Sequence, residues 1–431
     1  MTDQLSYQEL VNQGVLLMQT ENYGKAAEFF QSAIGLDPSA KEGYFHLGNA
    51  KANLDQLDEA LDAFRRVVEI DPEDGEAYFD IGNIYLLKNN LLRCVENFNT
   101  AEERGFKRVE LYSTLAAVYM HLDEGQQAVR TLSKAIKVAP LRADLRLEKA
   151  KVYIAMGKFD EALDTLEEER KLFPDAFEVY DLQTQIYSGM KRYDKALEII
   201  SDAVERFDED VVLRWMKIKV LVEMGRIAQA KEEIGIIQGM TDYHTVAREV
   251  ALQRSIILSM ENDLKRAAEV LEQALTQDGT ISDDQLRYML MNIQYGLKQY
   301  EKALENAEKL AALEDDGLFC VSGKYYAAYI RKTMGQTEAA SETFRKLTAE
   351  FRRLSIKNPT FYELYMYRLL CHKEIGEFEK ALQLAEYMEN LFPDRADAYT
   401  FRSLIYDDMG CTAEAEIARA EAKKRNPNLN I

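Results

Sequence analysis

The sequence has little of what irregular or cysteine-based proteins use. Its 431 residues include 7 prolines, 21 glycines and 4 cysteines, while 47% are apolar and 30% charged. This balance excludes a disordered chain and favours an ordered helical one. Because the few cysteines form no Cys-x-x-Cys pair, neither a zinc knuckle nor a redox motif is supported, and a reducing compartment is favoured.

Basic residues are in deficit, and long apolar runs are missing. There are 54 lysines and arginines against 74 acidic residues, a net charge of -20. Because so acidic a surface repels phosphate groups, we expect no nucleic-acid ligand. The negative charge is compatible with a basic partner, and its simpler explanation is that it keeps the protein soluble. No run approaches the roughly 18 apolar residues of a membrane span, and the polar N-terminus does not resemble a signal peptide. We therefore expect a cytoplasmic protein without membrane insertion.

Catalytic arrangements are also missing. No two of the 4 histidines lie four residues apart, which excludes a His-Glu-x-x-His zinc pair. Cys371 and His372 are adjacent, and neighbours on a helix point about 100° apart, so we prefer packing to a Cys–His dyad. The stretch Gly317–Lys324 has the wrong glycine spacing for a phosphate loop, and Tyr325 follows its lysine. We expect no enzyme activity, no metal and no cofactor.

What the sequence does contain is a 34-residue repeat. Its clearest copy, Lys41–Asp74, reads as two amphipathic helices closed by Pro72, which cannot continue a helix. Seven units, this copy among them, run at a strict period of 34, and five more follow at longer or equal steps. The twelve units begin at Tyr7, Lys41, Gly75, Val109, Ala143, Phe177, Val211, Arg248, Asp284, Val321, Tyr362 and Ala396.

The twentieth position of the unit is the most regular. Small residues at a helix crossing let two backbones approach, and a larger side chain would overpack the junction by about 1–3 kcal/mol. We therefore predict that this position is a buried crossing point in every unit. It holds Ala26, Ala60, Cys94, Ala128, Ala162, Ala196, Ala230, Ala267, Ala303, Ala340, Ala381 and Ala415.

The unit resembles the tetratricopeptide repeat, whose signature is W-x2-L-G-x2-Y, then A-x3-F, then P. The resemblance covers residues 7 to about 430 and is strongest through residue 208. It implies an all-α fold, an α-solenoid that forms a right-handed superhelix of about twelve helix-turn-helix repeats. The eighth position departs from small residues at Ile218, Met291 and Leu369, which leaves the packing there open. The second unit carries the signature as Tyr44, Leu47, Gly48, Ala60, Phe64 and Pro72.

The regularity of the repeat divides the chain into a lead over residues 1–6, seven regular units over 7–247 and five less regular units over 248–431. A seven-residue excess before Tyr362 predicts an extended helix and a longer connection near 352–361 that ends at Pro359. The last helix, rich in alanine and charge, would form a polar cap. Turns within units are predicted at Asn22-Tyr23-Gly24, Gly157-Lys158 and Gly225-Arg226.

The resemblance also implies a binding surface. In this family the first helix of each unit lines the concave face, with positions 2, 5, 9 and 12 on one inward stripe. Exposed apolar patches usually bind a partner, and asparagine amides pair with peptide backbones; the alternative is burial against neighbouring first helices. The predicted partner-binding residues are Val11, Val15, Phe45, Asn49, Phe79, Asn83, Leu86, Lys151, Trp215, Lys219, Tyr288, Asn292, Tyr295, Tyr325 and Tyr329.

The expected function is a non-catalytic scaffold or adaptor that binds a peptide segment or protein partner in the concave groove. The alternative is a peptide-sensing regulatory protein that acts through a separate output protein, because only six residues precede the first unit. Architectural self-assembly also stays open. A chaperone C-terminal tail is not expected as ligand, since the family's basic clamp is missing from the inward sites, which hold Val11, Val15, Phe45, Phe79 and Asp80.

Overall fold

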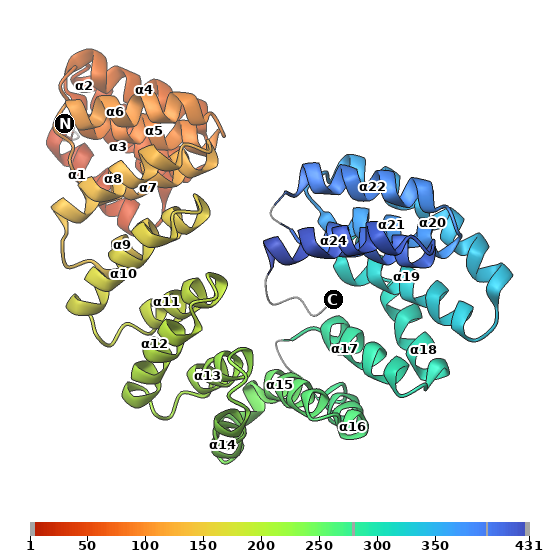
Figure 1. The fold of residues 1–431 in the computed structure, drawn as a ribbon. Coiled ribbons are helices and arrows are strands. Elements are labelled where there is room, and N and C mark those ends of the chain that lie inside the picture. The colour runs from red at the N-terminus through yellow and green to blue at the C-terminus, as the bar shows by residue number, and fades with distance from the viewer. Residues whose placement is uncertain (1–4, 278–280, 394, 427–431) are drawn as a thin grey trace. The chain divides into compact units, whose positions relative to one another are not determined.

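The protein is a succession of helix pairs (Figure 1). The structure, a computed structural model, describes residues 5–277, 281–393 and 395–426. Within these residues it contains 24 α-helices, one short 3₁₀ helix, η1 (Tyr243–Thr245), and no strand. The all-α fold of about twelve two-helix repeats predicted from the sequence is confirmed. Residues 1–4 of the expected N-terminal lead and residues 427–431 of the last repeat lie outside the described residues.

The chain forms two compact units, residues 1–206 and 207–431, which we call unit 1 and unit 2. The first contains six helix pairs. They are α1 (Tyr7–Gln19) with α2 (Tyr23–Leu36), α3 (Lys41–Asn53) with α4 (Leu57–Ile70), α5 (Gly75–Leu87) with α6 (Leu91–Glu103), α7 (Val109–His121) with α8 (Gly125–Val138), α9 (Ala143–Ala155) with α10 (Phe159–Leu172), and α11 (Phe177–Gly189) with α12 (Tyr193–Arg206).

Six further pairs make up the described part of unit 2. They are α13 (Val211–Glu223) with α14 (Ile227–Ile237), α15 (Ala247–Met260) with α16 (Leu264–Ala274), α17 (Asp283–Gly296) with α18 (Tyr300–Ala311), α19 (Leu318–Thr333) with α20 (Thr337–Lys357), α21 (Tyr362–Glu374) with α22 (Phe378–Leu391), and α23 (Asp397–Asp408) with α24 (Thr412–Arg425).

The first helices begin at or near the residues where the repeat starts. From α1 to α13 all seven begin at the expected residue, and α21 begins at Tyr362. The largest difference is at α19, which begins at Leu318 instead of Val321 because Gly317, with extended backbone, forms its N-cap. The division at residue 247 into a regular and a less regular section concerns repeat spacing and remains our proposal. It does not coincide with the boundary between the two compact units, which follows residue 206.

Helix α20 absorbs most of the extra residues in its repeat. It has 21 residues, about two turns more than the 14-residue α22, the second helix of the next pair, and Phe351 and Leu354 continue its buried face. The predicted extension is therefore confirmed, but the connection is shorter than the expected 352–361. Only Asn358–Phe361 link α20 to α21, and the Tyr365 hydroxyl fixes this link by donating to the Pro359 carbonyl oxygen at 3.2 Å.

The turn inside each pair contains one residue with positive φ. Glycine occupies this place in five pairs, including the predicted turns at Gly157 and Gly225. In the first pair the expected turn is misplaced, because Glu21 takes the positive φ and α2 already begins at Tyr23, so Tyr23 and Gly24 are helical. The non-glycine residues in this conformation are Glu21, Asp55, Asn89, Asp123, Lys191, Asn262 and Lys298.

The core of each pair lies at the crossing of its two helices. All twelve residues at the twentieth position, from Ala26 to Ala415, are 0% exposed, which confirms the predicted crossing point. In the first three pairs a glycine faces a phenylalanine across this crossing. A Cβ atom added to Gly14, Gly48 or Gly82 would come within 2.4 to 2.8 Å of that ring, so no larger residue fits without movement.

In two of the pairs without a small residue at the eighth position, the large residue lies on the first helix and the small one on the second. Met291 packs in one core cluster with Ala307, and Leu369 packs in another with Ala385, where earlier pairs have glycine and phenylalanine. The crossing is thus filled from the opposite helix. The pair with Ile218 shows no such exchange, since Ile234 is the corresponding residue and both are buried.

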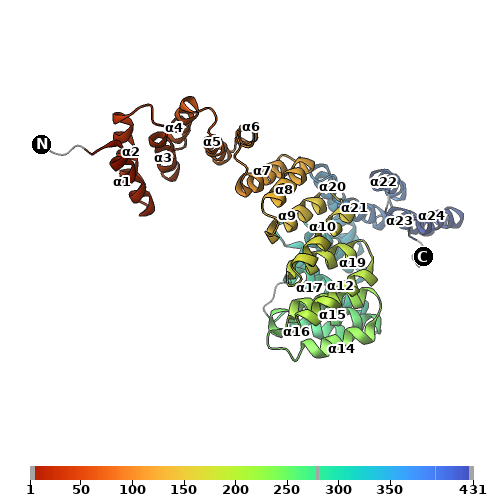
Figure 2. The ribbon, with the colours of Figure 1, turned by 90° about the vertical axis from the view of Figure 1, so that its left-hand side faces the viewer.

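Neighbouring pairs pack through their first helices as well as in chain order. In unit 2, α17 contacts α19 and α19 contacts α21, and in unit 1 α1 contacts α3. Figure 2 shows α1 to α6 as successive pairs. We call the surface formed by the first helices of a unit its first-helix face. None of the helices in the described residues combines the length and apolar character needed to cross a bilayer.

Candidate partner-binding surface

The predicted binding residues of unit 1 lie mainly on α3 and α5, and the two phenylalanines among them pack inward. The Phe45 ring meets the Phe64 ring edge-on, with centroids 5.8 Å apart. Phe79 stacks on Phe98 at 5.4 Å and on Phe106 at 4.7 Å. Both rings are half-buried, so each serves the helix crossing and leaves only part of its surface for a partner.

Asn83 lies beside a carboxyl group, that of Asp80. Burial raises the pKa of Asp80 to about 7, and the nearby charge of Glu76 adds to the increase, while a hydrogen bond from Asn83 and the Arg108 guanidinium oppose it. Glu76 is itself paired with Arg108, at 3.2 Å. Near neutral pH the Asp80 carboxyl therefore passes between a hydrogen-bond donor and an acceptor. The sequence pattern marked Asp80 only as a non-basic residue and gave no signal of this burial.

In unit 2 the structure brings tyrosines from three successive first helices into contact. We call this group the tyrosine cluster. Ring centroids are 5.8 Å apart for Tyr295 and Tyr329, 5.8 Å for Tyr325 and Tyr329, and 5.1 Å for Tyr325 and Tyr367. Tyr326 joins Tyr288 to Tyr367, at 6.3 and 6.2 Å. The members of the cluster are Tyr288, Tyr295, Tyr325, Tyr326, Tyr329 and Tyr367.

The Tyr326 and Tyr329 hydroxyl groups of this cluster stay protonated at neutral pH. Burial raises the pKa of Tyr326 and of Tyr329 to about 12, and neighbouring tyrosines add to the increase. Tyr367 donates to the Ser322 Oγ at 2.9 Å, and the Tyr295 hydroxyl lies 3.3 Å from the Thr333 Oγ1. Sequence spacing missed Tyr326 and Tyr367, because contact between neighbouring first helices, and not position on one helix, brings them together.

The other predicted residues are more scattered. Val11 and Tyr325, each 5% exposed, are corrections, because both are core residues without surface to offer. Val15, Leu86 and Asn49 are half-buried and Lys151 is exposed, all in unit 1. In unit 2, Lys219 is exposed, Trp215 has a buried indole N–H with no hydrogen-bond partner among the described residues, and Asn292 donates to the Tyr288 carbonyl oxygen at 2.8 Å.

Groups capable of metal or nucleophile chemistry do not gather at either face. In the described ranges no three histidine, cysteine or acidic side chains are placed to hold a metal ion. Cys371 is buried, which raises the pKa of its thiol. The Nδ1 atom of His372 lies 2.7 Å from Glu377 Oε2, so the partner of this imidazole is a carboxylate and not the adjacent thiol.

Comparison with known proteins agrees with this architecture. A tetratricopeptide repeat family model matches residues 17–81 and 119–186, and no curated protein matches the chain. Among solved structures, YrrB, a TPR protein with an unusual peptide-binding site, is 23% identical over 42% of this chain and 92% of its own, with a TM-score of 0.36. The MamA protein is 24% identical over 39% of this chain and 92% of its own, with a TM-score of 0.35.

A tetratricopeptide repeat protein from Parabacteroides merdae is 14% identical over 59% of this chain and 98% of its own, with a TM-score of 0.36. The family matches fall on helix pairs of unit 1, and the same two-helix unit recurs in all twelve described pairs. The matched residues and the recurring helix pairs are therefore similar to those of the tetratricopeptide repeat family.

Proposed function

We propose that this protein is a non-catalytic scaffold that binds a peptide segment or a protein partner on its first-helix faces. The tyrosine cluster carries the proposal, because it gathers six aromatic rings from three helix pairs on one face. Tyrosine gives a large apolar contact area and a hydroxyl donor at low entropic cost, and it is enriched where proteins bind one another. The half-buried members, such as Tyr295 and Tyr329, keep surface available.

The first-helix face of unit 1 is a second contact area in this proposal. Asn49 and Asn83 are half-buried at equivalent positions of adjacent pairs, and each amide has both a donor and an acceptor for an extended backbone. The net charge of -20 favours a basic partner. Phe45 and Phe79, four residues before these asparagines, contribute apolar surface but are held by the core.

Substitutions that spare the core test the proposal. Replacing Tyr288, Tyr295 and Tyr329 by phenylalanine removes three hydroxyl groups and keeps the rings in place. The variant and the wild type would be used as baits in the same pull-down, with recovery of each co-purified protein quantified by mass spectrometry. We expect at least tenfold lower recovery of specific partners, since a handful of interface contacts supplies most of the binding energy.

The matched control is Tyr387→Phe, which removes a hydroxyl from an exposed tyrosine on the second helix α22. It should leave recovery unchanged. If the triple variant retained every partner at the wild-type level, with the same circular dichroism spectrum, the tyrosine cluster would have no role in binding. An equivalent test for unit 1 is Asn49→Ala with Asn83→Ala.

A further inference from the structure

The second helix of nearly every pair begins with a large apolar residue. Threonine takes this place in α20 and α24, and α8 begins with Gly125. The large residues at this position are Tyr23, Leu57, Leu91, Phe159, Tyr193, Ile227, Leu264, Tyr300 and Phe378.

Several of these residues cover the core of their own repeat. Leu57 and Leu91 pack against the cluster around Phe64 and Phe98, and Tyr300 packs on the cluster of its own pair in unit 2. In the fourth pair Gly125 contributes no side chain. The core beneath it, made of Ala116, Ala128, Val129, Leu132 and Val152, is flanked by Met120 and Met156.

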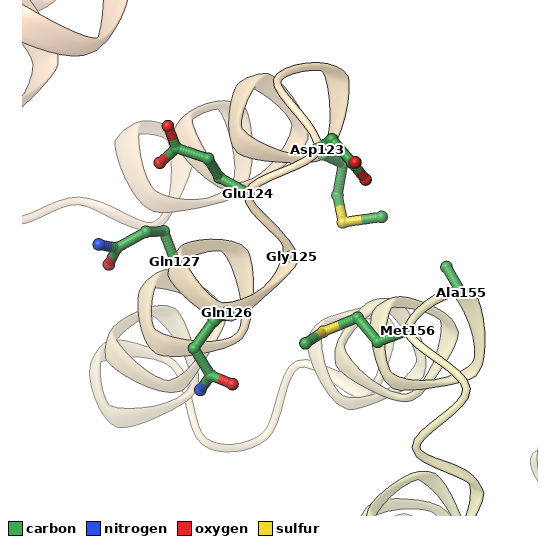
Figure 3. A pocket seen from close by; sticks show the side chains of 8 residues that line it. Asp123, Glu124, Gly125, Gln126, Gln127, Ala155 and Met156 are labelled. Carbon is green, nitrogen blue, oxygen red and sulfur yellow. The ribbon is translucent and has the colours of Figure 1, made fainter.

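A hollow of about 390 Å³ lies at this place, lined by Met120, Asp123, Glu124, Gly125, Gln126, Gln127, Ala155 and Met156 (Figure 3). Its volume is within the range of about 300–1,000 Å³ typical of ligand sites. Figure 3 shows the Met156 side chain directed toward Gly125. A Cβ atom added to Gly125 would lie 2.8 Å from Met156 Sδ, so any side chain there would compete with this thioether for the hollow.

The rim of the hollow is acidic. Asp123 and Glu124 are exposed, and neither forms an ion pair with any residue that the structure describes. The neighbouring Gln126 is engaged, because its Oε1 accepts from Lys158 Nζ at 3.2 Å. Methionine side chains adapt to varied apolar partners, and two free carboxylates favour a cation beside the apolar group. The lining thus favours an apolar side chain flanked by lysine or arginine.

We propose that the hollow at Gly125 binds one leucine or phenylalanine side chain of a protein segment, with adjacent basic residues paired to Asp123 and Glu124. The bound side chain takes the place that Leu91 fills in the preceding pair. This inference rests on the proposed function and makes it more specific. Met120 holds the same repeat position as Leu86 in the pair before it, so the hollow lies at the end of the predicted binding stripe of unit 1.

The test uses synthetic peptides of defined sequence and the full chain. The probe is Gly-Ser-Lys-Lys-Leu-Lys-Lys-Ser-Gly with a fluorescent label. One comparison peptide has alanine at the centre, and another has glutamate in place of every lysine. Fluorescence anisotropy gives each Kd, and methyl NMR signals of ¹³C-labelled Met120 and Met156 locate the bound peptide. We expect the leucine peptide to bind at least tenfold more tightly than either comparison peptide and to shift both methyl signals.

Variants of the protein separate binding in the hollow from electrostatic attraction between the basic peptide and the acidic surface. Gly125→Leu fills the hollow and should remove the leucine preference, whereas Gly35→Leu, at a helical glycine with open space around it, should not. Asp123→Asn with Glu124→Gln should weaken the lysine peptide several-fold and keep the preference for leucine over alanine. Both changes lie on the surface, and Asn tolerates the positive φ of Asp123.

The inference is overturned if the wild type shows no preference for leucine over alanine, or if Gly125→Leu keeps that preference. Binding of an uncharged apolar probe such as cyclohexanol, without binding of any peptide, would also overturn it in favour of a small-molecule site. If native partners depend on the tyrosine cluster but the hollow shows no leucine preference, the proposed function stands and this inference fails. If no variant changes partner recovery, the proposed function fails while the peptide comparison still decides the role of the hollow.

Discussion

The ring of Phe98 lies so close to Gly82 that a Cβ atom added to the glycine would be 2.5 Å from the ring carbons Cδ1 and Cε1. In the next pair the same two positions hold Ala116 and Leu132, both buried in one cluster. In these two pairs the residue at the eighth position is matched in size to the facing residue of the second helix, whereas Ile218 faces the equally large Ile234. The matching explains why the eighth position tolerates glycine, alanine, methionine and leucine in different repeats.

Gly82→Ala should destabilise unit 1 by about 1–3 kcal/mol, because the new methyl group overpacks the crossing. Adding Phe98→Leu should recover most of this loss, since it recreates the alanine–leucine pair of the following repeat. Urea denaturation of the two single variants and the double variant would measure the coupling. Gly35→Ala is the control, since a Cβ atom there meets open space. Additive effects in the double variant would contradict the size matching.

Asp80→Asn should stabilise the protein at pH 8 and have little effect at pH 4. In the folded protein burial raises the pKa of Asp80 to about 7, while an unfolded aspartate has a pKa of about 3.9. The native state therefore binds the proton more tightly, and stability falls as pH rises from about 4 to 7. We expect a gain on the order of 1–3 kcal/mol at pH 8.

Thermal melts of wild type and variant across this pH range would test that prediction. Asp62→Asn, at an exposed carboxylate on α4, serves as the control. A difference between Asp80→Asn and wild type that did not change with pH would show that ionisation of Asp80 plays no part in the stability of unit 1.

Arg146 and Glu169 form a buried charge pair. Arg146 holds the repeat position that tyrosine takes in other repeats, such as Tyr180 in the next one. The Arg146 guanidinium donates to the Pro140 carbonyl oxygen at 2.8 Å and lies 3.5 Å from a Glu169 carboxylate oxygen that is fully buried. In the next pair the Tyr180 hydroxyl makes the equivalent bond to the Pro174 carbonyl oxygen, at 2.9 Å. Glu169→Ala should cost roughly 3 kcal/mol, because it leaves a buried guanidinium without its counter-charge.

Arg146→Tyr in the Glu169→Ala background should restore much of the stability by recreating the uncharged arrangement. Urea denaturation of the two variants measures both effects. Equal stabilities for Glu169→Ala and the double variant would indicate that Arg146 remains satisfied by the proline carbonyl alone.

Lys191→Gly should raise stability by about 1 kcal/mol, since a residue with a Cβ atom is strained in the left-handed conformation and Lys191 has φ of 57°. Asn262→Gly, at φ of 63°, should give a smaller gain because asparagine adopts this conformation more readily. Differences in melting temperature would rank the two variants. A loss of stability in Lys191→Gly would mean that its side chain makes contacts worth more than the strain.

The parts of the fold set by local spacing were predictable, and the parts set by neighbouring repeats were not. The crossing alanines and the helix starts follow from periodicity within one pair, so Ala26 or Val211 could be placed from sequence. Tyr325 could not, because its burial depends on Tyr367, a residue of the next repeat whose ring lies 5.1 Å away. The hollow at Gly125 could not be predicted from the sequence either, because it arises where a side chain is lacking and not from a contact with a neighbouring repeat.

The matched sizes of Gly82 with Phe98 and of Met291 with Ala307 have a consequence for how such a chain grows during evolution. Both members of a match belong to the same helix pair, so a gene duplication that copies a whole pair copies the fit with it. A crossover inside the turn between the two helices would join a glycine to an alanine, or a methionine to a phenylalanine. We therefore expect recombination to preserve the fit at the boundaries between pairs and to disturb it at the turns within them.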